Sequence, residues 1–187
     1  MARIKNNHSM EGITGKVGNI FVYRHRNGET IVAKTPDKTA PLTEKQKNQT
    51  KKFKAAITYA KNALLEPSLK EDYDKEAKKR KKGSAYNLAV ADYLNPPIIV
   101  SIDHSGYTGA TSDEKITIEV EDDFKVIKVK VKIIEKNKTI IEEGEATLSR
   151  GKWQYKTTTL NATLAGSKII ISAIDRPNNI TTQEITL

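Results

Sequence analysis

The sequence predicts a two-domain protein, with a basic α+β domain over residues 1–95 and an all-β sandwich over residues 96–187. The first 95 residues hold 20 Lys and Arg against 10 Asp and Glu, whereas the remainder holds 12 against 13. The spacing of apolar residues changes across the same point, from the period of a helix to the period of a strand. Asn95-Pro96-Pro97 lies at this change, and a Pro-Pro step stops a helix and stiffens a linker.

A β-hairpin is expected at residues 19–34. Asn27-Gly28 separates two apolar-rich runs there, and both positions of an Asn-Gly turn tolerate the positive φ angles of a two-residue hairpin loop. Before the hairpin, Gly12, Gly15 and Gly18 recur at every third residue, which permits tight turns or close packing against a neighbour.

Three helices are predicted between the hairpin and the Pro-Pro step, at about residues 43–65, 68–82 and 84–94. Thr43 with Gln46, and Ser68 with Glu71, fit capping boxes that begin the first two helices. Pro67 is expected to end the first helix, which carries one narrow apolar stripe. The stripe consists of Phe53, Ala56, Ile57, Ala60 and Leu64.

Glycine and serine mark the next boundary. Gly83 is expected to end the second helix, and Ser84 is placed to cap the third. The hairpin and the three helices make residues 1–95 an α+β domain, whose apolar helix stripes must pack against one another or against a partner.

Short strands fill the chain after Pro97. The clearest is Lys125–Lys132, where Val or Ile alternates with Lys over much of its length, so one face is dry and the other wet. The predicted strands are Ile98–Asp103, Lys115–Glu121, Lys125–Glu135, Thr139–Glu142, Glu145–Leu148, Trp153–Leu160, Lys168–Ala173 and Thr182–Leu187. Seven or eight such strands in this length are typical of a β-sandwich, and a small barrel is the alternative.

Composition excludes several classes of site. The chain of 187 residues contains no cysteine, so neither a disulfide framework nor a thiolate metal site is available. No apolar stretch follows the basic N-terminus, and no run of eighteen apolar residues occurs, so neither a secretory signal nor a spanning helix is expected. A cytoplasmic location without membrane contact is therefore expected, and carriage in or on an exported particle stays open.

Residues 98–187 resemble bacterial immunoglobulin-like domains. The resemblance is carried by Gly151-Lys-Trp-Gln-Tyr155 and by Ile169-Ile-Ile-Ser-Ala173-Ile-Asp175-Arg-Pro-Asn-Asn179. The second stretch is similar to the A-x-D-x-x-G-N turn of such modules, with Pro177-Asn178-Asn179 where Pro/Ala-Gly-Asn is usual. The resemblance implies a sandwich that acts as a spacer or a recognition surface, because this fold serves many functions.

Residues 12–95 resemble a group of uncharacterised bacterial proteins known only as a domain of unknown function. The matching features are Gly15-Lys-Val-Gly-Asn19 with the strand after it, the Thr43-x-x-Gln46 helix start, and Phe53 and Ala56 one to two turns later. The resemblance implies a shared fold and an association with phage or phage-derived particles.

Three candidate chemistries have weak support. Gly12-Ile-Thr-Gly15-Lys-Val-Gly18 lacks the Ser or Thr and the following helix that a phosphate loop requires. His8, His25 and His104 are scattered, whereas a zinc site needs clustered ligands. A nucleophile with a neighbouring base is not evident, so no catalytic residue, no metal ligand and no cofactor is assigned, and the protein is expected not to be an enzyme.

Acidic residues also gather near one predicted strand end. They are Glu119, Glu121, Asp122 and Asp123, with Asp103 and Asp175 expected near a pole of the sandwich. Oxygen ligands of this kind can hold calcium between loops. The spacing of a calcium loop is missing, so a solvated acidic turn is the favoured interpretation.

Two basic runs in the first domain are the candidate partner-binding residues: Lys51, Lys52, Lys54, Lys78, Lys79, Arg80, Lys81 and Lys82. The dipole of a helix favours cations near its C-terminus, but one or two charges would be enough for that purpose. So dense a positive surface indicates a polyanion or an acidic protein as partner. A solvated face that serves only solubility is the structural alternative.

The sequence therefore predicts a non-enzymatic structural or interaction protein. Its basic N-terminal domain would dock onto an acidic assembly, and its immunoglobulin-like domain would be a spacer or recognition module. A component or cargo of a phage-like or contractile injection particle fits this description. The rival hypothesis is a nucleic-acid-binding protein that uses the basic helices, and the oligomeric state is left open.

Overall fold

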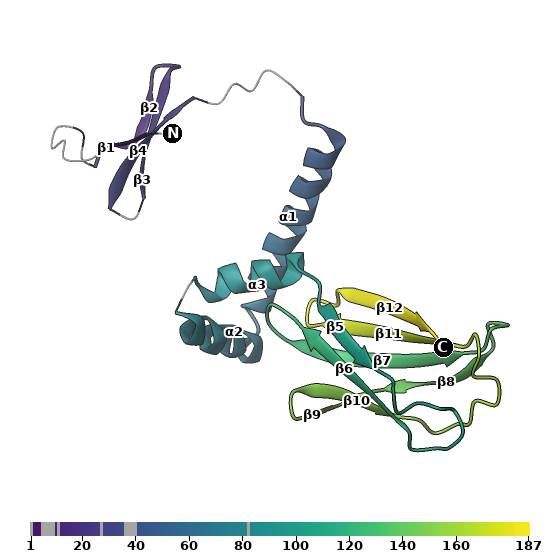
Figure 1. Cartoon of the computed structure of the whole chain (residues 1–187). Coiled ribbons are helices and arrows are strands. Elements are labelled where there is room, and N and C mark those ends of the chain that lie inside the picture. Colours follow the sequence, from purple (N-terminus) through teal and green to yellow (C-terminus); the bar gives the residue numbers. More distant parts are fainter. Residues whose placement is uncertain (1, 5–9, 11, 27, 36–40, 82) are drawn as a thin grey trace. The chain divides into compact units, whose positions relative to one another are not determined.

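The computed structural model of the protein describes residues 2–4, 10, 12–26, 28–35, 41–81 and 83–187. Within these residues it contains three α-helices and three antiparallel β-sheets, so the chain is a mixed α+β protein (Figure 1). The chain forms two compact units, Met1–Gln46 and Lys47–Leu187.

The first unit is built on a four-stranded sheet of order β1-β4-β3-β2. The predicted hairpin is confirmed: β3 (Phe21–Arg26) pairs with β4 (Glu29–Lys34), with Arg26 opposite Glu29. Two short strands were not predicted, β1 (Ala2–Ile4) and β2 (Gly15–Val17), which pair with β4 and β3. They escape a periodicity search because three residues are too few to show a pattern.

This N-terminal sheet covers little apolar surface. Among the described side chains of the first unit, Thr30 alone is buried. Val17, Ile20 and Phe21 are 55%, 62% and 45% exposed. A small sheet is stabilised mainly by packing one face against another element, and the described side chains of this unit include no such apolar core.

Helix α1 (Glu44–Ala63) begins at the predicted capping box. The Gln46 N–H donates to Thr43 Oγ1 at 3.3 Å, and the Thr43 N–H donates to Gln46 Oε1 at 2.9 Å. Two orphan backbone donors are thereby satisfied. In the second half of the helix the buried residues are Ala56, Ala60 and Ala63, so a narrow stripe of small residues is the packed face.

Helix α2 (Pro67–Arg80) begins differently from the prediction. Glu66 is its N-cap and makes no side-chain capping bond, whereas the Ser68 hydroxyl donates to Glu66 Oε1 at 2.9 Å. The capping box expected at Ser68 is therefore wrong. Pro67 begins this helix, because proline at the first helical position has a suitable φ and lacks an N–H that would be unsatisfied anyway.

Helix α2 also ends earlier in the sequence than predicted. Lys81 adopts the left-handed conformation, with φ 52°, and its N–H donates to the Lys78 carbonyl. The helix thus ends two residues before the expected Lys82, which lies outside the described residues, and Gly83 is not its cap.

Helix α3 (Ala85–Leu94) is capped by Ser84 as predicted, since Ser84 Oγ accepts a hydrogen bond from the Asn87 N–H at 3.2 Å. Residues of all three helices form one apolar cluster. Its buried members are Ala60, Ala63, Tyr73, Ala85, Leu88 and Ala89, and Phe124 from the β-rich part of the chain packs against them.

Eight strands follow, and each of the eight predicted strands has a counterpart. They are β5 (Ile98–Asp103), β6 (Lys115–Glu121), β7 (Val126–Ile134), β8 (Ile140–Glu145), β9 (Thr147–Ser149), β10 (Lys152–Lys156), β11 (Lys168–Asp175) and β12 (Ile180–Thr186). They form two four-stranded sheets, of orders β5-β6-β10-β9 and β12-β11-β7-β8, which we call the paired sheets.

The paired sheets share one hydrophobic core, and strand alternation explains it. Half-buried and buried residues alternate along the whole of β11, and they alternate in the same way in β7 from Val129 to Ile133. Ile116 and Ile118 of β6 belong to the same buried cluster as residues of β7 and β11. On the other face of β7, Lys128 and Lys132 pair with Glu145 and Glu143 of β8, which confirms the predicted wet face.

The helices pack against one end of the paired sheets. The Asn179 side chain donates to the carbonyls of Asp92 and Tyr93, both at 3.2 Å, and the Thr181 hydroxyl donates to the Pro97 carbonyl at 2.5 Å. The compact unit Lys47–Leu187 accordingly contains α2, α3 and the paired sheets together. This division differs from the expected boundary at residues 95 and 96, because the Pro-Pro step marks a change of composition and these contacts cross it.

Candidate functional site

The first basic run lies on a part of α1 where the described residues leave the side chains exposed. Lys51, Lys52, Phe53 and Lys54 are all exposed, and Phe53 is 47% exposed. Phe53 thus lies outside the packed face of α1, and its burial against a partner stays a prediction. We call Lys51–Lys54 the α1 basic segment: three lysines and one exposed aromatic residue that are adjacent in the sequence.

Lys52 also has a local contact. Its Nζ donates to the Leu94 carbonyl at the end of α3, at 3.3 Å. A cation beside the last carbonyls of a helix is favoured by the helix dipole. Lys51 and Lys54 form no ion pair within the part of the chain that the structure describes.

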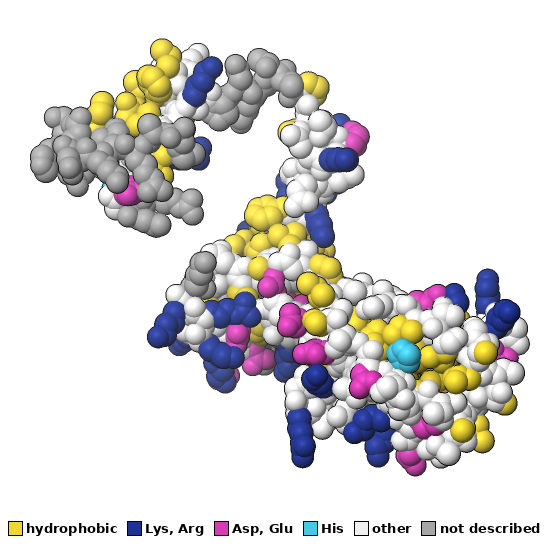
Figure 2. All heavy atoms as spheres, viewed as in Figure 1, with side chains coloured by type: hydrophobic (Ala, Val, Ile, Leu, Met, Phe, Trp, Pro, Cys, Tyr) yellow, Lys and Arg dark blue, Asp and Glu magenta, His cyan; other side chains and the backbone are white. Residues whose placement is uncertain are grey.

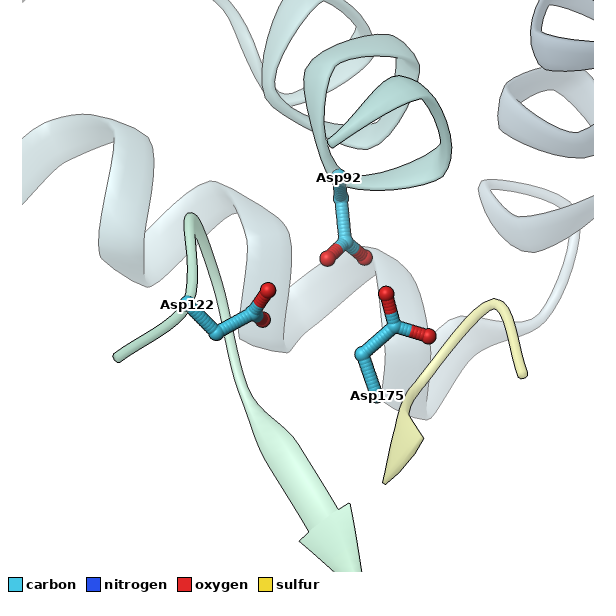
Figure 3. Close-up of side chains that lie close together, drawn as sticks. All are labelled: Asp92, Asp122 and Asp175. Atoms are coloured by element: carbon cyan, nitrogen blue, oxygen red, sulfur yellow. The ribbon is translucent and has the colours of Figure 1, made fainter. Parts of the chain in front are cut away.

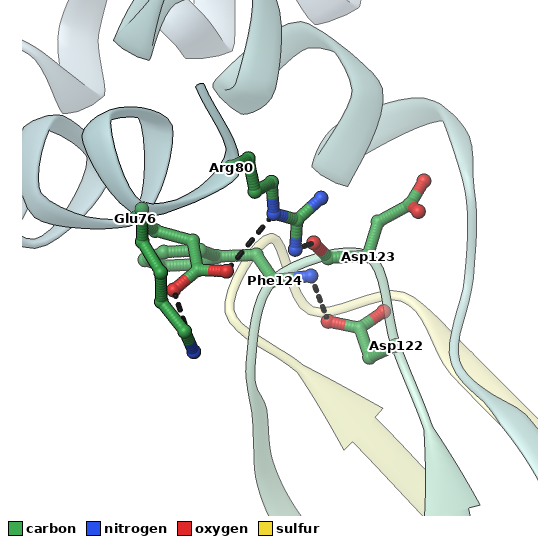
Figure 4. A network of polar contacts seen from close by, with 6 residues as sticks. Glu76, Arg80, Asp122, Asp123 and Phe124 are labelled. Atoms are coloured by element: carbon green, nitrogen blue, oxygen red, sulfur yellow. Dashed lines mark hydrogen bonds and ion pairs between the residues drawn. The ribbon is translucent and has the colours of Figure 1, made fainter. Parts of the chain in front are cut away.

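The second basic run lies at the end of α2, where Lys78, Lys79, Arg80 and Lys81 are exposed. Glu76 neutralises part of it, because its carboxylate binds Arg80 Nε at 2.9 Å and Lys79 Nζ at 3.6 Å. The Arg80 guanidinium also donates to the Asp123 carbonyl (Figure 4). Arg80 thus connects α2 to the loop between β6 and β7, and its role is at least partly structural.

Positive charge is not confined to the helices. Figure 2 shows Lys and Arg side chains over the helical segment and also over the paired sheets, in several places beside Asp and Glu side chains. The partner-binding role of the predicted basic residues stays a prediction, and their surroundings differ: the α1 basic segment contains no acidic residue, whereas the end of α2 is mixed in charge.

The joint between α2 and the paired sheets also contains an aromatic stack and an ion pair. The rings of Tyr73 and Phe124 stack with centroids 4.2 Å apart. The Arg176 guanidinium lies 5.9 Å from the centroid of Phe124 and binds Asp72 at 3.2 Å. A cation over an aromatic ring adds attraction to the ion pair, so this joint combines apolar and charged contacts.

Three carboxylates lie close together, as Figure 3 shows. Asp92 comes from the last turn of α3, Asp122 from the loop between β6 and β7, and Asp175 from the end of β11. Each contributes an oxygen within 4.8 Å of the other two. Asp92 and Asp175 are fully buried and Asp122 is half-buried. We call Asp92, Asp122 and Asp175 the carboxylate cluster.

The hydrogen bonds of the cluster satisfy some of its oxygens and leave others unpaired. Asp92 Oδ2 accepts from the Tyr73 hydroxyl at 2.5 Å, and Asp122 Oδ2 accepts from the Phe124 N–H at 3.1 Å. Asp175 accepts from the Asn179 N–H at 2.6 Å and from its side-chain amide at 2.7 Å. Asp92 Oδ1 and Asp122 Oδ1 are buried and have no partner among the described residues.

Burial and mutual repulsion disfavour a negative charge on all three carboxylates of the cluster at once. Burial raises the pKa of Asp92 to about 7, and the charges of Asp122 and Asp175 add to this rise, against the Tyr73 hydrogen bond and the Arg176 charge. Burial also raises the pKa of Asp175, although hydrogen bonds from Asn179 oppose it. Burial raises the pKa of Tyr73 as well, so this hydroxyl stays a donor.

The raised pKa of Asp92 predicts a specific pH dependence of stability in a buffer that contains EDTA. Between the ordinary pKa of an aspartate and about 7, the folded state binds the proton of Asp92 and the unfolded state does not. The contribution of this group to the free energy of unfolding is therefore complete below about pH 4. It falls by about 4 kcal/mol as the pH rises to 7.

Asp92→Asn provides the control for this prediction. Urea denaturation of both proteins across this pH range should show the free energy of unfolding of the wild type falling relative to that of the variant. Parallel curves would mean that Asp92 titrates normally.

The sequence anticipated the cluster only in part. The sequence predicts Asp122 at an acidic strand end and Asp175 near a pole of the sandwich, and it does not single out Asp92. Other acidic residues of that group lie elsewhere: Glu119 binds Lys152 at 3.3 Å, and Asp103 accepts hydrogen bonds from Ser105. The available signal for Asp92 was an aspartate in a helix that is otherwise almost entirely apolar.

No helix in the described part of the chain is long and apolar enough to cross a membrane. A comparison with protein-family models finds none that matches the chain, and a comparison with curated proteins finds no match either.

Proposed function

We propose that the protein is a non-enzymatic interaction protein that docks onto an acidic protein surface through its basic N-terminal part. Residues 98–187 then serve as an immunoglobulin-like spacer or recognition module. A phage-like or contractile injection particle is the kind of assembly proposed, on the basis of the sequence resemblance of residues 12–95.

The α1 basic segment is the observation that carries the docking proposal. Phe53 is 47% exposed between Lys52 and Lys54. An exposed aromatic residue within a run of lysines supplies an apolar anchor and the charge complementarity that protein interfaces use. The exposed apolar residues of the N-terminal sheet, Val17, Ile20 and Phe21, support a second contact with a partner.

The charge pattern of α2 favours a protein partner over a nucleic acid. Lys75 pairs with Glu71 at 2.7 Å, and Glu76 pairs with Lys79 and Arg80. A nucleic-acid interface is expected to be much more positive than this mixed surface. A protein surface that carries both signs of charge matches it better.

The strand order supports an immunoglobulin-like assignment of the paired sheets. With β5, β6, β9 and β10 as strands A, B, D and E, the first sheet has the order ABED. The second sheet, with β7, β8, β11 and β12, corresponds to strands C, C′, F and G. Immunoglobulin-like sandwiches divide their strands between the two sheets in this way.

A binding titration with two probes tests the docking proposal. The full chain is titrated by fluorescence anisotropy into a labelled poly-glutamate peptide and, separately, into a labelled single-stranded DNA of about 20 nucleotides. The triple variant Lys51→Glu, Lys52→Glu, Lys54→Glu is expected to weaken binding of poly-glutamate at least tenfold, because each reversal replaces attraction by repulsion.

The matched control is Lys115→Glu, Lys136→Glu, Lys156→Glu, which changes the net charge equally at exposed lysines of the β-rich part. The proposal expects less than a threefold effect from this control. Equal losses in the two variants would overturn the α1 segment as the docking site. Tighter binding of the DNA, with a logarithmic salt slope near −0.7 per phosphate contacted, would support nucleic-acid binding instead.

A further inference from the structure

We propose that the carboxylate cluster of Asp92, Asp122 and Asp175 is a calcium site that fastens the helices to the paired sheets. The proposal is independent of the docking function, because none of the three residues belongs to the basic runs.

The ligand chemistry points to a hard divalent cation. Three carboxylates converge with no histidine or cysteine among them, and oxygen-only sites select calcium or magnesium over zinc. Two oxygens on opposite sides of a calcium ion lie about 4.6–5.2 Å apart, since each bond is about 2.3–2.6 Å long. One oxygen from each of the three carboxylates lies within 4.8 Å of the other two, so one calcium ion can be bound by all three residues.

The unpaired oxygens are a second and independent indication of a ligand. Asp92 is fully buried, and its Oδ1 has no hydrogen-bond partner among the described residues although both of its oxygens point into the cluster (Figure 3). Asp122 Oδ1 is buried and unpaired as well. Buried polar atoms almost always have a partner, and a cation at the centre of the cluster would bind both oxygens.

The charge around the cluster is incompletely balanced. The positive charge of Arg176 lowers the pKa of Asp92. Arg176 also forms an ion pair with Asp72, so its charge is shared between two carboxylates. Tyr73, Asp122 and Asp175 face Asp92 from α2 and from the β-rich part. A divalent cation would compensate the excess negative charge, which a single shared proton would do only in part.

The cluster also borders a surface pocket. An open pocket is lined by Asn95, Pro96, Ile98, Glu121, Asp122 and Asp123. Asp122 therefore belongs both to this pocket and to the cluster.

The position of the cluster gives the ion a structural role. Its ligands come from α3, from the β6–β7 loop and from the end of β11. An ion bound by all three would resist separation of the helices from the paired sheets. Because the ion binds only the folded state, it would stabilise the unit in proportion to the logarithm of its concentration.

Thermal unfolding of the full chain in EDTA, in magnesium and in calcium tests the proposal. Calcium is expected to raise the unfolding midpoint by several degrees, with a calcium dissociation constant of about 10⁻⁶ to 10⁻⁴ M by titration calorimetry. Terbium, which replaces calcium at oxygen sites, should show emission on tyrosine excitation, because the Tyr73 hydroxyl contacts Asp92.

The variants separate loss of the site from loss of the fold. Asp122→Asn should weaken calcium binding at least thirtyfold and abolish the terbium signal. In EDTA at pH 8 it should unfold at or above the midpoint of the wild type, because it removes like-charge repulsion. Glu121→Gln, which removes a neighbouring charge outside the cluster, should leave calcium affinity within threefold of the wild type.

Two results would overturn the proposal. One is an unchanged midpoint at about 10 mM calcium, which would leave the cluster held by its hydrogen bonds alone. The other is equal loss of calcium affinity in Asp122→Asn and Glu121→Gln, which would indicate diffuse binding to acidic surface.

Discussion

Tyr73→Ala is expected to lower the free energy of unfolding by about 4 kcal/mol. Tyr73 is fully buried, and its ring stacks on Phe124. Its hydroxyl donates to Asp92 at 2.5 Å and lies 3.0 Å from the Tyr59 hydroxyl. Truncation would leave a cavity between the three helices and the β6–β7 loop, and it would leave Asp92 Oδ2 without a partner.

Tyr73→Phe is the matched control, because it keeps the ring and removes only the hydroxyl. We expect it to cost about 1–3 kcal/mol, the usual effect of leaving a buried acceptor unsatisfied. Urea denaturation of both variants separates the loss of the ring from the loss of the hydroxyl. Equal losses would mean that the ring does not pack as described and that the hydrogen bond accounts for the whole effect.

Asn179→Asp is expected to have a similarly large effect, a loss of about 4 kcal/mol at pH 8. The Asn179 amide donates to Asp175 at 2.7 Å and to the carbonyls of Asp92 and Tyr93. A carboxylate cannot donate these bonds, and it would add a fourth negative charge beside the carboxylate cluster.

Asn178→Asp places the same chemical change on the neighbouring residue, which is exposed and adopts φ 68°. Asp tolerates the left-handed conformation about as well as Asn, so we expect an effect within about 0.5 kcal/mol. If chemical denaturation gave equal losses for the two variants, the Asn179 side chain would not connect α3 to the turn between β11 and β12.

Local signals predicted most of the secondary structure, because short-range chemistry decides it. The Thr43 and Ser84 caps, the hairpin and the alternating strands each depend on residues a few positions apart. The capping box at Ser68 failed because Pro67 offers a competing start one residue earlier. Periodicity shows that Phe53 shares a helix face with the packed alanines, and not whether another element or a partner covers that residue.

Local signals could not predict the contacts between the helices and the paired sheets. Asp92 and Asp175 are far apart in the sequence and meet only after α3 packs on the paired sheets. Arg80 was read as one charge in a basic run, whereas its contact with the Asp123 carbonyl depends on where the β6–β7 loop lies. The Pro-Pro step marks a change of composition, and composition does not show which side chains cross it.

If the helices and the paired sheets are one folded unit, they must unfold together. Thermal unfolding of the full chain can be followed by far-UV circular dichroism, which reports on the helices, and by the fluorescence of Trp153, the single tryptophan, which lies on β10. We expect one midpoint for both signals, as for a cooperative unit. Loss of the helical signal at a temperature where Trp153 fluorescence is still that of the folded protein would contradict it.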